Sequence, residues 1–138
     1  MATVFRLLRI PGVCPVWETV HRIYALEVNG FCCTNIFLED LRSSKPDEYK
    51  KLMKVLKLIG SNIRVRNPEH VKSHVEQSGI YEMIAKRGNS RISFFYDSSP
   101  EENVICVLSY WKNFKNEQKQ DAFFRKSVET MNVYRLSR

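Results

Sequence analysis

The chain contains 138 residues, of which 43% are hydrophobic, and its formal net charge at pH 7 is +7. This size and composition predict a single domain over residues 1–138, because the apolar content suffices for one hydrophobic core but hardly for two. No apolar run approaches the roughly 20 residues that cross a bilayer, and the first residues lack the apolar centre of a secretory signal, so we expect a cytoplasmic protein. The positive charge predicts a polyanionic partner, which can be nucleic acid, an anionic membrane surface or an acidic protein.

Regular structure is first indicated over residues 21–33, which are rich in β-forming side chains and contain an Asn-Gly turn signal at 29–30. Apolar residues at helical spacing then predict a helix over 34–44. Pro46 suits the first turn of a second helix, whose apolar stripe ends at Gly60. A pair of helices with a break at the "SSKP" corner is therefore expected.

The stretch "NPEHVKSHV" from Asn67 opens with a capping residue, a proline and an acid, which predicts a short helix. Three extended runs follow over 79–86, 91–96 and 104–111, and turn residues join them, so we expect consecutive antiparallel pairing. A last helix is predicted over 117–134. The expected fold class is α+β: a small twisted antiparallel sheet with two N-terminal helices packed on it and a C-terminal helix.

The four cysteines and three histidines show no spacing that is typical of a metal site. No two cysteines form a C-x-x-C pair, so we expect reduced and mostly buried thiols. His70 and His74 are four residues apart and would share one face of a helix, but no third ligand lies near them in the sequence. We therefore expect no bound metal.

Alternation along the extended run 91–96 predicts an exposed basic surface. It places Arg91 on one face with Ser93 and Phe95, and the residues between them on the other face. If that other face packs on the helices, Arg91 lies on the open, concave face of the sheet. Cations and aromatic residues near the same edge would then hold phosphates and stack bases; the candidates are Arg64, Arg66, Lys86, Arg87, Lys112, Lys115, Tyr110 and Trp111.

These residues also have plainer interpretations that the sequence leaves open. Aromatic residues in strands usually belong to the core. Arg91 could pair with Glu82 on the neighbouring strand instead of binding phosphate. The second helix carries a lysine cluster that can be solvated without binding anything: Lys50, Lys51, Lys54 and Lys57.

Two segments, "GIYEMIAKRGNSRISFFYD" and "VICVLSYWKNFKNEQKQDAF", resemble the C-terminal half of RelE/HigB-type toxins of type II toxin–antitoxin systems. Upstream, "FLEDL" and the helix "YKKLMKVLKLIG" are similar to a motif and a helix of the same family. The resemblance extends over about residues 23–131, more weakly in its first half. The residues in register with the family pattern are Gly79, Ile80, Tyr81, Glu82, Gly88, Arg91, Tyr96, Leu108, Tyr110, Lys112 and Ala122.

The resemblance implies a RelE-like domain that cleaves mRNA on the ribosome and so inhibits translation. Residues 1–20 lie outside the match as an N-terminal extension, which could pack as an added strand or an arm. It implies a cognate antitoxin, mRNA and the ribosome as partners, with no membrane, metal or cofactor. Such mRNA interferases use the 2′-hydroxyl of the RNA as nucleophile, so the protein supplies proton transfer and cations. Family roles carry over to Arg91, as phosphate stabiliser, and to Lys112. Lys86, Arg87, Lys115 and His70 are candidates to substitute for two family cations that this chain lacks.

The chain departs from the family pattern at two cations, which are replaced by Ile84 and Asn113. This leaves two alternatives open: a non-catalytic toxin that inhibits DNA gyrase, as ParE-type relatives do, and a basic RNA-binding module without toxicity. The nuclease assignment requires Arg91 and Lys112 to share an open hollow. Burial of either group, or a permanent acidic partner, would exclude it.

Overall fold

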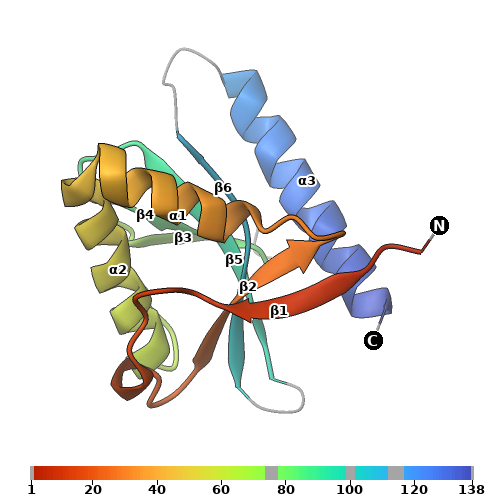
Figure 1. The fold of residues 1–138 in the computed structure, drawn as a ribbon, viewed down its shortest axis with the longest axis horizontal. Helices are drawn as coiled ribbons and strands as arrows, with labels where there is room; N and C mark the ends of the chain where they lie inside the picture. The colour runs from red at the N-terminus through yellow and green to blue at the C-terminus, as the bar shows by residue number, and fades with distance from the viewer. Residues whose placement is uncertain (1, 74–77, 99–101, 112–116, 138) are drawn as a thin grey trace.

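The computed structural model describes residues 2–73, 78–98, 102–111 and 117–137. Within these ranges the chain forms six strands, one short 3-10 helix and three α-helices (Figure 1). In chain order they are β1 (Phe5–Arg9), η1 (Pro15–Trp17), β2 (Arg22–Val28), α1 (Cys33–Ser44), α2 (Pro46–Ser61), β3 (Val71–Ser73), β4 (Tyr81–Ile84), β5 (Ser90–Asp97), β6 (Asn103–Trp111) and α3 (Glu117–Leu136).

The strands form one sheet in the order β1-β2-β6-β5-β4-β3. β2 and β6 run parallel, with Arg22 opposite Asn103, whereas the other neighbouring strands are antiparallel. A parallel pair requires a long crossover connection, which here contains both α1 and α2. The α+β class is confirmed, but the sheet is mixed rather than antiparallel. Two strands also precede the helices, so α1 and α2 are not N-terminal.

Two of the strands lie outside the extended runs expected from the sequence: β1, which was left open as an added strand or an arm, and β3, where a helix was expected. β1 lies within residues 1–20, which the resemblance treats as an extension, and it pairs along β2 at the edge of the sheet. β3 replaces the short helix predicted from Asn67. The Asn67 carbonyl does accept hydrogen bonds from the amides of His70 and Val71, which is one helical turn, but the next residues pair with β4 instead. The rest of that predicted stretch, at 74–75, lies outside the described residues.

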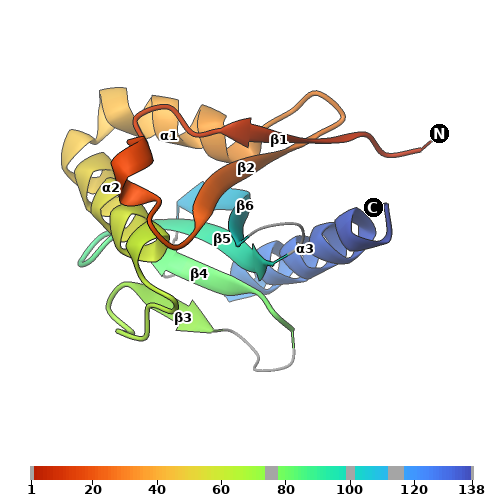
Figure 2. The same cartoon turned by 90° about the horizontal axis from the view of Figure 1, so that it is seen from below.

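Helices cover both faces of the sheet. Figure 2 shows α1 and α2 on one side of the central strands, while α3 lies along the other side. One buried apolar cluster fills the first interface and includes Leu56 of α2 and Phe94 of β5. A second cluster fills the other interface and includes Met131 of α3 and Phe95 of β5. Alternation along β5 therefore assigned its two faces correctly, but neither face is open.

Candidate functional site

Arg91 lies inside the protein rather than on an open surface. Its exposed fraction is 7%, and its Nε lies 3.2 Å from Oε1 of Glu82, which is 4% exposed. Arg91 is opposite Ile84 in the β4–β5 register, so Glu82 is its diagonal neighbour on the same face. The predicted open position of Arg91 is wrong because α3 covers this face. The alternative pairing with Glu82 is confirmed.

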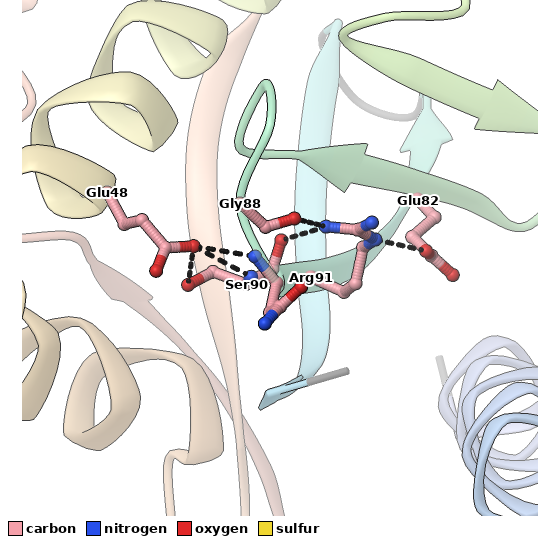
Figure 3. Close-up of polar contacts among 6 residues, drawn as sticks. Glu48, Glu82, Gly88, Ser90 and Arg91 are labelled. Carbon is pink, nitrogen blue, oxygen red and sulfur yellow. Dashed lines mark hydrogen bonds and ion pairs between the residues drawn. The ribbon is translucent and has the colours of Figure 1, made fainter. Parts of the chain in front are cut away.

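The same guanidinium also holds the turn between β4 and β5. Its Nη1 donates hydrogen bonds to the carbonyl oxygens of Gly88 and Ser90, each at 2.9 Å (Figure 3). A phosphate could engage Arg91 only by displacing Glu82, and leaving one partner of a buried ion pair uncompensated costs about 3–5 kcal/mol. Arg91 is therefore a structural residue, and the role of phosphate stabiliser does not fit it.

Glu48 at the start of α2 holds the turn from the other side. Its Oε1 accepts hydrogen bonds from the amide of Asn89 at 2.8 Å, the amide of Ser90 at 3.1 Å and the hydroxyl of Ser90 at 3.0 Å (Figure 3). A carboxylate that accepts several hydrogen bonds makes a strong, charge-assisted contact. The turn is thus fixed to α2 as well as to β4.

The turn itself leaves little freedom to its residues. Arg87 has a φ of 60°, in the left-handed region that side chains other than glycine rarely adopt. A Cβ at Gly88 would lie 2.2 Å from Oε1 of Glu48, so the close approach of the carboxylate requires glycine here. The amide of Gly88 donates to the carbonyl of Ala85 at 2.7 Å. Lys86 and Arg87 are consequently presented on a rigid tip.

A hollow of about 390 Å³ opens beside this tip, and we call it the basic hollow. Lys51 Nζ donates to the carbonyl of Lys86 at 2.9 Å, which joins α2 to the turn. Lys86 Nζ lies 3.1 Å from Oε2 of Glu69 on the exposed rim. Cations therefore dominate the electrostatics of this hollow, whose lining residues are Lys51, Lys54, Val55, His70, Lys86 and Arg87.

His70 also lines the basic hollow. Its amide donates to the carbonyl of Asn67 at 3.0 Å, and its carbonyl accepts from the amide of Ile84 at 2.9 Å, so its backbone is fixed against β4. The side chain is half-buried, and its Nδ1 is buried without a hydrogen bond in the described part of the chain.

Arg64 and Arg66 do not line the basic hollow. The guanidinium of Arg64 lies over the ring of Tyr96, 3.8 Å from its centroid. Tyr96 is near the far end of β5, roughly 20 Å from Ser90 at 3.3 Å per residue. Arg66 follows in the same connection after α2 and is exposed.

The predicted residues at the end of β6 are only partly described. The ring of Tyr110 packs on Phe123 of α3, with 4.0 Å between the centroids, so this ring is engaged with the helix rather than free for a base. Lys112, Lys115 and the side chain of Trp111 lie outside the described residues, and their assignments stay predictions.

The cysteines are free; Cys32 and Cys106 are buried, as expected, while Cys14 is exposed. In the described ranges, no three His, Cys, Asp or Glu side chains come together in a group that could hold a metal ion. Nor does any helix in those ranges combine the length and the apolarity needed to cross a membrane.

No protein-family model matches this chain, and no curated protein matches it. The resemblance to RelE-type toxins consequently depends on the motifs of the sequence and on the order of its elements.

Sequence reasoning did not assign Lys51 and Lys54 to a site. Their spacing of three residues places them on one face of α2, but a solvated helix shows the same pattern. His70 was weighed only as one of a pair with His74 on a helix, or as a substitute for a missing cation. These residues lie together only because α2 and the segment before β4 both pack beside the β4–β5 turn, and this proximity exists only in the folded chain.

Proposed function

We propose that this protein is a RelE-type toxin that binds RNA in the basic hollow and acts on mRNA at the ribosome. The observation that carries this proposal is the convergence of Lys51 and Lys54 from α2 with Lys86 and Arg87 from the β4–β5 turn. Lysine ammonium groups act as point charges for phosphate, and a guanidinium can contact two phosphate oxygens at once. The volume of the hollow lies in the lower part of the range that ligand sites occupy.

Preorganisation distinguishes this surface from an ordinary solvated lysine cluster. The tip that carries Lys86 and Arg87 is held by Glu48 and Arg91, so little ordering entropy remains to be lost on binding. A lysine cluster that is merely solvated on one helix would not require hydrogen bonds that join the helix to a turn elsewhere in the chain. The burial of Arg91 against Glu82 excludes the nuclease site that the resemblance implied, in which Arg91 and Lys112 share an open hollow. We therefore propose a site that uses neither residue and lies at the edge of the sheet, beside α2.

The motifs and the order of elements support the toxin part of the proposal. The succession of β2, α1, α2, β4, β5, β6 and α3 follows the order in which the resemblance places its motifs, and β1 and β3 are additional to them. A cognate antitoxin would be expected to cover the basic hollow with acidic residues, and its association would be salt-sensitive.

A second candidate is a ParE-type toxin that inhibits DNA gyrase without cleaving RNA. The burial of Arg91 favours it, because the arginine that the RelE-type assignment requires for phosphate contact is committed to Glu82. Purified protein should be assayed in parallel for cleavage of mRNA on translating ribosomes and for inhibition of supercoiling. Supercoiling inhibition with intact message would replace the first proposal by the second.

RNA binding itself is tested by fluorescence anisotropy with a labelled single strand. The double variant Lys51→Ala/Lys54→Ala should bind more weakly and lower the salt slope by about 0.7 per lysine removed. Arg42→Ala/Lys126→Ala removes the same charge from exposed positions on α1 and α3, away from the hollow. Equal losses in the two variants would show binding by net charge alone and would contradict a defined site.

A further inference from the structure

We propose that His70 is the proton acceptor of the basic hollow, which takes the proton of an RNA 2′-hydroxyl when that oxygen attacks the adjacent phosphorus. The inference rests on the proposed function, because it requires RNA to occupy the hollow. It adds a residue that neither the motif resemblance nor the sequence spacing places in this role.

The chemistry of the lining residues singles out His70. Lysine and arginine side chains are protonated at neutral pH and Val55 has no polar group, whereas an imidazole exchanges a proton between about pH 5 and 8. The four cations would hold the phosphate and stabilise the charge that develops on it. Among the residues that line the hollow, His70 alone combines a position beside that phosphate with the ability to accept a proton.

His70 is also placed for this role by its surroundings. Its backbone is locked by hydrogen bonds to Asn67 and Ile84, so the ring is carried on a fixed point of the hollow wall. His21 provides the contrast: it is 1% exposed, and its Nε2 contacts the Ile63 carbonyl at 3.0 Å. His21 is thus committed to the structure, whereas His70 is only half-buried and lines the hollow.

The proposed step is an attack of the RNA on its own backbone. The 2′-oxygen forms a bond to phosphorus as its proton passes to the imidazole, and the bond from phosphorus to the 5′-oxygen breaks. The 5′-oxygen leaves with a proton from water in the open hollow, and the imidazolium later returns its own proton to water. The products are a 2′,3′-cyclic phosphate and a free 5′-hydroxyl, with no redox change and no metal in the step.

The rim carboxylate Glu69 is the rival proton acceptor, although Lys86 already pairs with it. The experiment compares wild type, His70→Asn, His70→Gln and Glu69→Gln for RNA binding by anisotropy and for cleavage of message on translating ribosomes. The rate is followed between about pH 5 and 8. Circular dichroism melting checks that each variant folds, and a substrate with a 2′-deoxy nucleotide at the cleaved position tests the nucleophile.

Both His70 variants should bind RNA within about 2-fold of wild type and lose on the order of 10²–10⁴-fold in cleavage rate, together with the neutral limb of the pH profile. Glu69→Gln should keep both RNA binding and cleavage. Cleavage that survives in the His70 variants, or that is lost only in Glu69→Gln, would overturn the assignment. If wild type binds RNA without cleaving it, the role of His70 fails while RNA binding stands; if wild type does not bind RNA, the proposed function fails as well.

Discussion

Glu48 and Ser90 are 42 residues apart in the chain, yet one carboxylate oxygen of Glu48 accepts hydrogen bonds from both the amide and the hydroxyl of Ser90. This contact fastens the first turn of α2 to the start of β5. Since Lys51 lies on α2 and Lys86 on the turn before β5, the contact also sets the distance between the two walls of the basic hollow.

Replacement of this carboxylate should loosen the hollow. Glu48→Gln keeps the size of the side chain but removes the charge from a group that accepts three hydrogen bonds, and we expect a loss of about 2 kcal/mol in the free energy of unfolding. Urea denaturation measures it. Glu39→Gln, at an exposed position of α1, is the matched control and should change stability by less than about 0.5 kcal/mol. Equal effects would show that the Glu48 contact is not stabilising.

Gly88 is expected to be intolerant of any side chain while Glu48 is present. A Cβ at this position would meet the carboxylate at 2.2 Å, so Gly88→Ala should cost about 1–3 kcal/mol by overpacking. Gly30→Ala is the control for backbone strain alone, because Gly30 has a φ of 85° but open space around it. In a double-mutant cycle, Gly88→Ala should cost much less stability when Glu48 is already replaced by alanine. Additive losses in the free energy of unfolding would contradict the steric explanation.

Removal of Arg91 should destabilise the fold rather than abolish a phosphate contact. Arg91→Ala leaves Glu82 buried without its partner, and we expect a loss of about 3–5 kcal/mol in the free energy of unfolding. The double variant Arg91→Met/Glu82→Leu removes both charges together and should recover most of the lost free energy of unfolding. Intrinsic RNA affinity, measured where the variants are folded, should stay within a few-fold of wild type. A large loss of RNA affinity without loss of stability would show instead that Arg91 contributes to RNA binding.

Acid stability should depend on Glu18, which follows η1. Burial opposes ionisation of this carboxyl, but hydrogen bonds from Arg9 and from the Ile23 amide outweigh it, so the pKa of Glu18 is lowered from 4.5. A lowered folded-state pKa means that the stabilisation is complete above the unfolded-state pKa and is lost as the pH falls through the folded value.

Glu18→Gln should therefore be less stable than wild type at pH 7, and the difference should shrink as the pH falls below about 4. Thermal melts over a pH series measure this difference, and Glu39→Gln serves again as the exposed control. A difference that is constant across the series would show that ionisation of Glu18 does not contribute.

Local patterns predicted much of the fold. Alternation and turn residues located β4, β5 and β6, and apolar spacing located α1, α2 and α3, because these signals are contained within each segment. β1 stayed undecided between an added strand and an arm, because "FRLLR" is a short edge strand with two arginines whose strand character depends on β2 beside it. β3 was missed because a capping pattern at Asn67 competes with pairing to β4, and local propensity does not decide between them.

The site was predictable only in part, for a related physical reason. Alternation assigns residues to the two faces of a strand but does not say whether a second layer covers a face. The burial of Arg91, on the face against which α3 packs, could therefore not be predicted from β5 alone. Lys86 and Arg87 were found as candidates because the turn is local. Their meeting with Lys51 and His70 depends on contacts between segments that are far apart in the sequence.

The parallel alignment of β2 with β6 at the centre of the sheet has a consequence for synthesis and folding. The hairpin of β1 and β2 leaves the ribosome before the other strands, yet its inner edge has no strand to pair with until β6, which follows all of them in the described chain, has emerged. Pairing strands that are so far apart in the chain has a large entropic cost, so it is slow. Until it is complete, the unpaired edge of β2 can pair with strands of other chains. Nascent chains that end before β6 should therefore be prone to aggregation, whereas chains extended through α3 can complete the sheet.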